Sequence, residues 1–113
     1  MIKAVGSLQC LKEEIGDFHG IIVLCFVWTL EPTCMRAECM VSDLAAEFFP
    51  KNVRFFRILG EALHDTDIMN LFCLEVDDLP CIITVNINGF LSIGKILNSD
   101  KINEPNLRAI LPS

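Results

Sequence analysis

The stretch that decides the fold runs from Ile21 to Phe48 and reads IIVLCFVW, TLEPT and CMRAECMVSDLAAEF. Its first part, Ile21–Trp28, is an apolar run rich in β-branched and aromatic residues, which is typical of a strand buried on both faces of a parallel or mixed sheet. A short polar segment follows, in which Pro32 suits a first helical position because no backbone N–H is needed there. After it the apolar residues recur at offsets of three, four and seven, which predicts one face of a helix; they are Cys34, Ala37, Val41, Leu44, Ala45 and Phe48. A cysteine in the first turn of such a helix can be chemically special.

The length of 113 residues predicts one domain, residues 1–113, which buries about two thirds of the surface that the unfolded chain exposes. The hydrophobic fraction of 52% and the mean hydropathy of +0.48 are high for a soluble domain. No apolar run approaches the roughly 18 residues of a membrane span, so we expect no membrane contact. We expect the surplus of apolar residues to lie in a sheet buried on both faces and in a surface that binds a partner. Met1–Gly6 is too short for a secretory signal, so we expect a cytosolic or nuclear protein.

Charge and cysteine usage exclude several classes. The net charge is −6 and the nine Lys and Arg residues form no basic patch, so direct nucleic-acid contact is not expected. Six cysteines would indicate a disulfide scaffold in a small secreted chain, but four of them lie in apolar patterns, as small buried residues do. There is no Cys-x-x-Cys pair, and His19 and His64 lie far from any cysteine ladder. We therefore expect no metal and no cofactor.

The remaining patterns predict further elements on either side of the deciding stretch. Before it we expect a short edge strand over residues 2–5 and a helix over Leu8–Phe18 that is capped by Ser7. After it we expect a strand over Val53–Leu59 and two short helices, of which the first could instead be an irregular helical turn. The first of these helices follows the capping residues Asp65, Thr66 and Asp67 and carries Ile68, Leu71, Phe72 and Val76; the second carries Leu107, Ile110 and Leu111.

The clearest local signal is a hairpin. Cys81–Ile87 and Phe90–Ile96 are strand-like runs separated by Asn88-Gly89, the preferred pair for a two-residue type I′ turn. The predicted order is β-α-β-α-β-α-β-β-α, which indicates an α/β fold with a mixed central sheet and helices on both faces.

This order, with an elbow cysteine and a proline that opens the hairpin, resembles thioredoxin over about Ser7 to Leu111. The landmarks are the buried strand, the Cys34 helix, the pair Leu79-Pro80 and the Asn88-Gly89 hairpin. The resemblance implies a thioredoxin-like fold. It also implies a cis Leu79–Pro80 bond beside the elbow, although only about 5% of X–Pro bonds are cis.

The departures from this family bear on function. Aligned without a gap from Phe26, the family's Trp-Cys-x-x-Cys falls on what we call the elbow: Leu30, Glu31, Pro32, Thr33 and Cys34. The second cysteine is kept as Cys34, but Glu31 stands in place of the attacking cysteine, and a carboxylate cannot perform thiol–disulfide exchange. The family's buried, proton-shuttling aspartate falls on Cys25. The active site is therefore degenerate, and we lean towards a protein that is not an enzyme.

No other cysteine is an evident substitute for the lost one. Cys39 lies five residues beyond Cys34 on the same helix, roughly 8–9 Å away between Cα atoms, and disulfides need less than about 7 Å. Cys81 could approach the elbow. Cys34 alone could still react, because a helix N-terminus lowers a thiol's pKa, but Glu31 acts against this. Glu31 and Pro32 also have a purely structural interpretation as helix-starting residues.

Subfamilies without the first cysteine are the more similar ones. Glu31–Glu38, EPTCMRAE, resembles the elbow of the Dim/Dib-type splicing factors, which have an acidic residue, Pro-Thr-Cys-Met and a basic residue. Phosducin-like proteins, cofactors of the cytosolic chaperonin, share the Pro32-x-Cys34 elbow and the Leu79-Pro80 pair. The thioredoxin-like domain of multidomain glutaredoxins is a third candidate.

Three functions follow as hypotheses. The first is a non-catalytic interaction module, a subunit or adaptor of a larger assembly with protein partners, which keeps the elbow as a docking groove. The second is a monothiol redox protein in which Cys34 is glutathionylated or sulfenylated. The third is a plain structural subunit of a large assembly, in which the elbow has no function. The candidate contacts of the first are the apolar residues around the elbow, namely Trp28, Leu30, Pro32, Met35, Leu79, Pro80 and Cys81.

Overall fold

Strand β2 (Gly20–Val27) runs through the middle of a five-stranded mixed sheet. The computed structural model describes residues 2–28, 31–59, 66–74 and 78–112. The element order and the α/β fold class are those that the sequence predicts. The other elements are β1 (Ile2–Val5), α1 (Leu8–Ile15), α2 (Pro32–Phe48), a 3₁₀ turn (Phe49–Lys51), β3 (Val53–Leu59), α3 (Thr66–Leu71), β4 (Cys81–Ile87), β5 (Leu91–Leu97), a second 3₁₀ turn (Ser99–Lys101) and α4 (Glu104–Ile110).

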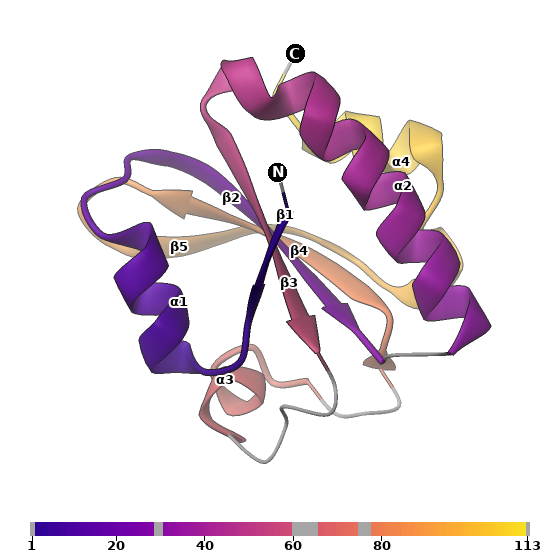
Figure 1. Cartoon of the computed structure of the whole chain (residues 1–113), viewed down its shortest axis with the longest axis horizontal. Coiled ribbons are helices and arrows are strands. Elements are labelled where there is room, and N and C mark those ends of the chain that lie inside the picture. The colour runs from indigo at the N-terminus through magenta and orange to yellow at the C-terminus, as the bar shows by residue number, and fades with distance from the viewer. Residues whose placement is uncertain (1, 29–30, 60–65, 75–77, 113) are drawn as a thin grey trace.

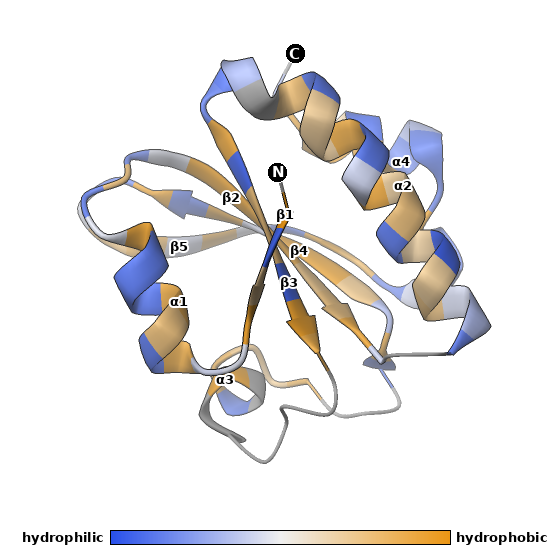
Figure 2. Cartoon of the chain, in the orientation of Figure 1, coloured by the Kyte–Doolittle hydropathy of each residue, from blue (hydrophilic) through white to orange (hydrophobic). Residues whose placement is uncertain are grey.

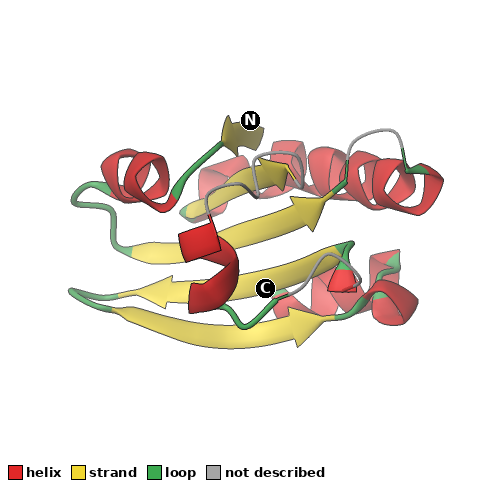
Figure 3. Ribbon diagram, turned by 90° about the horizontal axis from the view of Figure 1, so that it is seen from below, coloured by secondary structure: helices red, strands yellow, loops and turns green. Residues whose placement is uncertain are grey.

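The strands lie in the order β1-β3-β2-β4-β5, with β5 as the outermost strand in Figure 3. Strand β3 pairs in parallel with both β1 and β2, whereas β4 pairs antiparallel with both β2 and β5. Because β2 has a parallel neighbour on one side and an antiparallel one on the other, the two halves of the chain meet at this strand.

Helices cover both faces of the sheet. In Figure 1, α1 and α3 lie on one side and α2 and α4 on the other. Alternate residues of β2 enter two separate cores: Ile22, Leu24 and Phe26 pack with α1 and α3, and Val23, Cys25 and Val27 pack with α2 and α4. Each fully buried large apolar side chain contributes about 1.5–3 kcal/mol, so a strand buried on both faces anchors both layers. Figure 2 shows the central strands as hydrophobic and the outer surfaces of the helices as polar.

Two of the helices differ from the prediction at their ends. Ser7 caps α1 through its Oγ, which accepts the Cys10 N–H at 3.0 Å. The helix stops at Ile15 and not at Phe18, because Gly16 takes φ 50°, a conformation that ends helices and suits glycine. Helix α3 ends at Leu71, which is 48% exposed. The prediction that Leu71 lies on the buried face of this helix is therefore wrong. Asp65, Val76 and His64 lie outside the described residues.

The hairpin is confirmed, but its turn is not type I′. Ile87 pairs with Leu91, so the loop holds three residues, 88–90, and β5 starts one residue later than predicted. A type I′ turn needs positive φ at both central residues, whereas only Gly89 has it, at 81°. The longer loop needs a single left-handed residue, which glycine supplies without strain.

Trp28 also differs from the prediction. β2 ends at Val27, and the Trp28 side chain is 38% exposed, not buried in the strand as the apolar run suggests. Among the described residues, no helix is both long and apolar enough to cross a membrane.

We predict that Gly20→Ala destabilises the fold while Gly6→Ala does not. Gly20 has φ 149°, and a Cβ there would meet the Asn52 backbone oxygen at 2.8 Å and the Phe18 ring at 2.8 Å. Gly6 has no atom within 4 Å of the corresponding position. Overpacking of this kind costs about 1–3 kcal/mol, to which the strained φ adds. Urea unfolding of the two variants measures the difference; equal free energies of unfolding would contradict the packing described here.

Candidate functional site: the elbow between β2 and α2

The elbow lies where β2 ends and α2 begins, beside the start of β4. Phe26 pairs with Cys81, so Leu79 and Pro80, which precede β4, are brought next to the end of β2. The Leu79–Pro80 peptide bond is cis, as the resemblance implies. Leu79 packs against both cores. The predicted elbow residue Leu30 lies outside the described residues.

Glu31 starts α2. Its backbone oxygen accepts the Met35 N–H at 2.9 Å, and its carboxylate accepts the Cys34 N–H at 2.7 Å. This is the geometry of an N-cap, with Pro32 in the first helical position, so the structural interpretation of both residues is confirmed. The backbone hydrogen bonds from Cys34 and Thr33 lower the pKa of the Glu31 carboxyl below its ordinary value. Glu31 is therefore a carboxylate at neutral pH, hydrogen-bonded to the residue that carries the remaining thiol.

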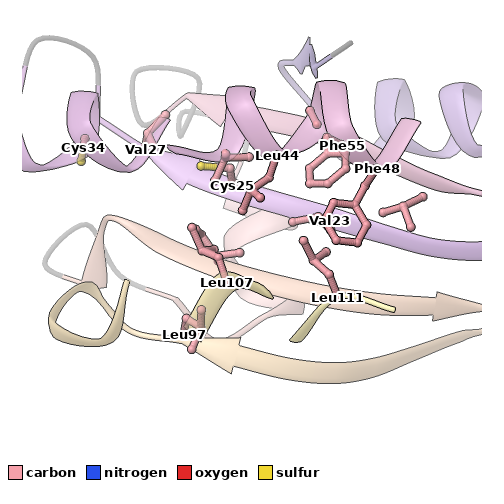
Figure 4. Packing of buried hydrophobic residues seen from close by; sticks show 14 residues of the cluster. Val23, Cys25, Val27, Cys34, Leu44, Phe48, Phe55, Leu97, Leu107 and Leu111 are labelled. Carbon is pink, nitrogen blue, oxygen red and sulfur yellow. The ribbon is translucent and has the colours of Figure 1, made fainter. Parts of the chain in front are cut away.

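Cys34 is buried, with 1% of its surface exposed, between the sheet and α2 (Figure 4). Burial raises the pKa of its thiol, and the neighbouring Glu31 carboxylate raises it further. A hydrogen bond with the Trp28 backbone lowers the pKa but does not offset these two effects. The helix N-terminus thus fails to make this thiol acidic, and Cys34 stays protonated at neutral pH.

Cys25 belongs to the same core as Cys34 and is completely buried (Figure 4). Burial, followed by the Glu38 carboxylate, raises the pKa of the Cys25 thiol far above its ordinary range, and Arg57 only partly opposes this. A thiol that keeps its proton at every physiological pH cannot exchange it as a buried carboxylate can. Cys25 therefore cannot serve as a proton-shuttling acid.

An ion pair between Glu38 of α2 and Arg57 of β3 lies close to these two thiols. This pair was not predicted, because the partners are 19 residues apart and come together only when α2 packs on the sheet. A signal in the sequence was Arg57 itself, a charged residue inside an otherwise apolar strand run, which needs a partner where it is partly buried. The Nε atom of Arg57 is buried without a hydrogen-bond partner among the described residues.

Cys81 does not reach Cys34. Cys81 packs in the core on the α1 side of the sheet, and Cys34 packs on the α2 side. Burial raises the pKa of Cys81 to about 11. All six cysteines, including the exposed Cys39, are free. Among the described residues, no three His, Cys, Asp or Glu side chains gather as a metal site.

The apolar residues predicted as contacts around the elbow differ in how exposed they are. Trp28 and Met35 are 38% and 50% exposed, and Pro32 is exposed as well. Pro80 and Cys81 are buried and present no side-chain surface to a partner. Apolar groups of Trp28, Pro32 and Met35 are therefore exposed around the elbow, next to the polar Thr33 and Arg36, while Cys34 is buried.

Comparison with known proteins agrees on the architecture. No protein-family model and no curated protein matches the chain. Among solved structures, a thioredoxin from Trichomonas vaginalis superposes with a TM-score of 0.73 at 16% identity, covering 96% of this chain and 92% of the other. The chain has the thioredoxin fold. Mitochondrial thioredoxin 3 from Saccharomyces cerevisiae gives a TM-score of 0.70 at 22% identity, with 96% and 92% covered. Thioredoxin NaTrxh from Nicotiana alata gives 0.74 at 15%, with 96% and 87% covered.

The thiol environments in this thioredoxin fold predict an order of alkylation. With iodoacetamide at neutral pH, we expect the exposed Cys39 and Cys73 to react first. Cys25, Cys34 and Cys81 should react only after the chain is unfolded, because they are buried and their pKa values are raised. Peptide mass spectrometry of samples taken over time measures this. Labelling of Cys34 as fast as that of Cys39 would contradict the geometry and favour the monothiol hypothesis.

Proposed function

We propose that this chain is a redox-degenerate thioredoxin-fold interaction module, a subunit or adaptor of a larger assembly. The observation that supports it best is the hydrogen bond from the Cys34 N–H to the Glu31 carboxylate. By the resemblance, Glu31 occupies the position of the attacking thiol. Here that position serves to start a helix and offers no nucleophilic sulfur.

Exchange by the family's route needs two thiols, one to attack the substrate disulfide and one to release the mixed disulfide. Cys34 is the single thiol of the described elbow, and it is buried and protonated. Cys25 is too weak an acid to shuttle a proton. The same facts count against the monothiol alternative, because glutathionylation and sulfenylation both begin from an accessible thiolate.

Binding is the capacity that the elbow retains. Trp28, Pro32 and Met35 present apolar surface around it, and Trp28 and Met35 are of the residue types that interfaces favour. Because no substrate disulfide has to be released, a partner could stay bound. This favours an interaction module over a plain structural subunit whose elbow carries nothing.

The kind of assembly is proposed from the EPTCMRAE segment of Glu31–Glu38. Its likeness to Dim/Dib-type splicing factors supports a nuclear assembly, and the Pro32-x-Cys34 and Leu79-Pro80 features shared with phosducin-like proteins support a cytosolic chaperonin cofactor. Cross-linking in cells followed by mass spectrometry distinguishes them, because the first predicts spliceosomal partners and the second chaperonin subunits.

We predict that the wild-type chain does not reduce insulin, and that Glu31→Cys gains activity. The substitution restores a Cys-x-x-Cys pair with Cys34, in which the new thiol at an exposed helix start can attack and Cys34 can resolve. The rate should stay well below that of a thioredoxin, because Cys25 still cannot accept a proton. An insulin-turbidity assay with dithiothreitol measures this. The double variant Glu31→Cys, Cys34→Ser is the control and should be inactive; turnover by the wild-type chain would contradict the proposal.

We predict that Met35→Lys weakens partner capture at the elbow while Leu71→Lys does not. The two side chains are matched, at 50% and 48% exposure, but Leu71 lies on α3 and not at the elbow. Burying a new charge at an apolar contact costs well over 1 kcal/mol, so capture of a partner identified by cross-linking should fall at least about tenfold. Equal retention by both variants, with folding checked by circular dichroism, would show that the elbow is not the docking site.

A further inference from the structure

Strand β5 exposes apolar side chains at the edge of the sheet. We call Phe90, Leu91, Ile93 and Ile96 the β5 stripe; these side chains are 72%, 49%, 51% and 51% exposed. Within the described part of the chain β5 pairs with β4 alone, so the main-chain groups along its other side have no strand partner there. Figure 3 shows no described element beyond this edge. An open edge with apolar side chains is a template for pairing with another strand.

A β-bulge places three residues of the stripe on one face. Leu91, Ile93 and Ile96 pair with Ile87, Val85 and Ile83, which all belong to the core on the α1 side. Without the register shift, Ile96 would point to the other face, because side chains alternate along a strand.

The bulge is specified by close contacts. Thr84 Oγ1 accepts the Lys95 N–H at 2.8 Å, and a Cβ at Gly94 would lie 2.6 Å from the same oxygen. The position of the β5 stripe is therefore specified by the sequence of the hairpin, because the bulge depends on Gly94 and Thr84.

The edge has few of the devices that prevent pairing. Proteins protect edges with charges, proline or covering segments, and with bulges that turn the strand away. Here the strand has one charge, Lys95, and no proline. The register shift lies between Ile93 and Ile96, so the stretch Phe90–Gly94, which reaches the start of the bulge, stays free to pair.

We propose that β5 pairs antiparallel with β5 of a second copy of this chain, about a two-fold axis at Ser92. This centre places Leu91 opposite Ile93 of the second copy and Phe90 opposite Gly94, which leaves room for the ring. A centre at Ile93 would place Leu91 opposite Lys95 and match an aliphatic side chain with a charge. The two-fold axis keeps both stripes on the same face of one continuous sheet.

The exposed apolar area of the β5 stripe is large enough for a small contact with a second copy of the chain. Four large apolar side chains, about half or more exposed, amount to roughly 400–500 Å², as much as the largest apolar patches on single proteins. A standard interface buries about 800 Å² on each partner. The main-chain edge and the Ser92 side chain add to the apolar area, so the contact is a small one and the dimer a weak one.

Charge also permits a second copy. The chain carries a net charge of −6, so two copies repel at long range. At the edge itself, however, the paired segment Phe90–Gly94 is uncharged, and the charged residues near it are the basic Lys95 and Lys12 and the acidic Asp17. Repulsion is therefore weak at the contact. The pairing segment also lies at the end of β4 away from Pro80, so both elbows stay free, and the dimer stands whether or not the elbow binds a partner.

The mass of the chain in solution tests the proposal. By light scattering, we expect twice the 12.7 kDa of one chain for the wild type, and the single mass for Ile93→Lys. Met35→Lys is the matched control, because Met35 is equally exposed at 50% but lies at the elbow, and it should stay dimeric. A monomeric wild type at about 100 μM, or a dimer that survives Ile93→Lys, would overturn the proposal. If Ile93→Lys does not fold, Leu91→Lys takes its place, with the same two outcomes.

A cysteine at the two-fold centre tests the register. Residues directly opposite in an antiparallel pair have Cα atoms about 4.5–5.5 Å apart, which suits a disulfide. In a chain carrying Cys39→Ser and Cys73→Ser, we expect Ser92→Cys to form a covalent dimer within minutes of mild oxidation. Ser99→Cys, also exposed, is the control and should stay monomeric on a non-reducing gel. Equal cross-linking of both variants, or none by Ser92→Cys, would overturn the register.

Discussion

The structure depends on the burial of β2 on both faces. Ile22 to Val27 are each at most 1% exposed, and their side chains alternate between the two cores. Both layers of helices pack against this strand, and both neighbouring strands take their register from it. The position of the elbow follows from the same constraint, because the chain leaves the interior at Val27 and re-enters a regular element at Pro32. The described elbow residues from Glu31 to Cys34 therefore lie between the end of β2 and the first turn of α2.

The elbow shows how one position can serve either chemistry or folding. A residue just before the first turn of a helix faces unpaired N–H groups, which favour an anion. A thiolate can use them to lower its pKa, and a carboxylate can use them to cap the helix. In this chain Glu31 takes the second role, and its carboxylate then raises the pKa of the thiol that remains. The carboxylate that supports α2 therefore also makes Cys34 less reactive.

Much of the fold could be predicted from the pattern of residues. The bounds of β3 and α2 agree with the prediction, because β-branched runs, a proline at a helix start and offsets of three and four are local signals. The exposure of Trp28, the end of α1 and the loop at Gly89 could not be predicted in this way, since each depends on a backbone angle or a neighbour. In the site, a structural role of Glu31 as partner of the helix dipole was one of two interpretations, whereas its N-cap hydrogen bond to the Cys34 N–H was not predicted. The Glu38–Arg57 pair was not predicted either, because its partners meet only across the packed layers.

The sequence by itself determined the order of elements, the two-sided central strand and the absence of a Cys-x-x-Cys pair, because hydrophobic period and residue identity are properties of the chain alone. Only the tertiary structure decided which faces the cysteines occupy, and therefore that Cys81 is separated by the sheet from Cys34. It also decided that a bulge turns Ile96 to the same face as Ile93, so that an apolar stripe forms on an open edge. The burial of a side chain and the face of the sheet on which it lies arise from the packing of distant segments. Local sequence patterns therefore do not predict them.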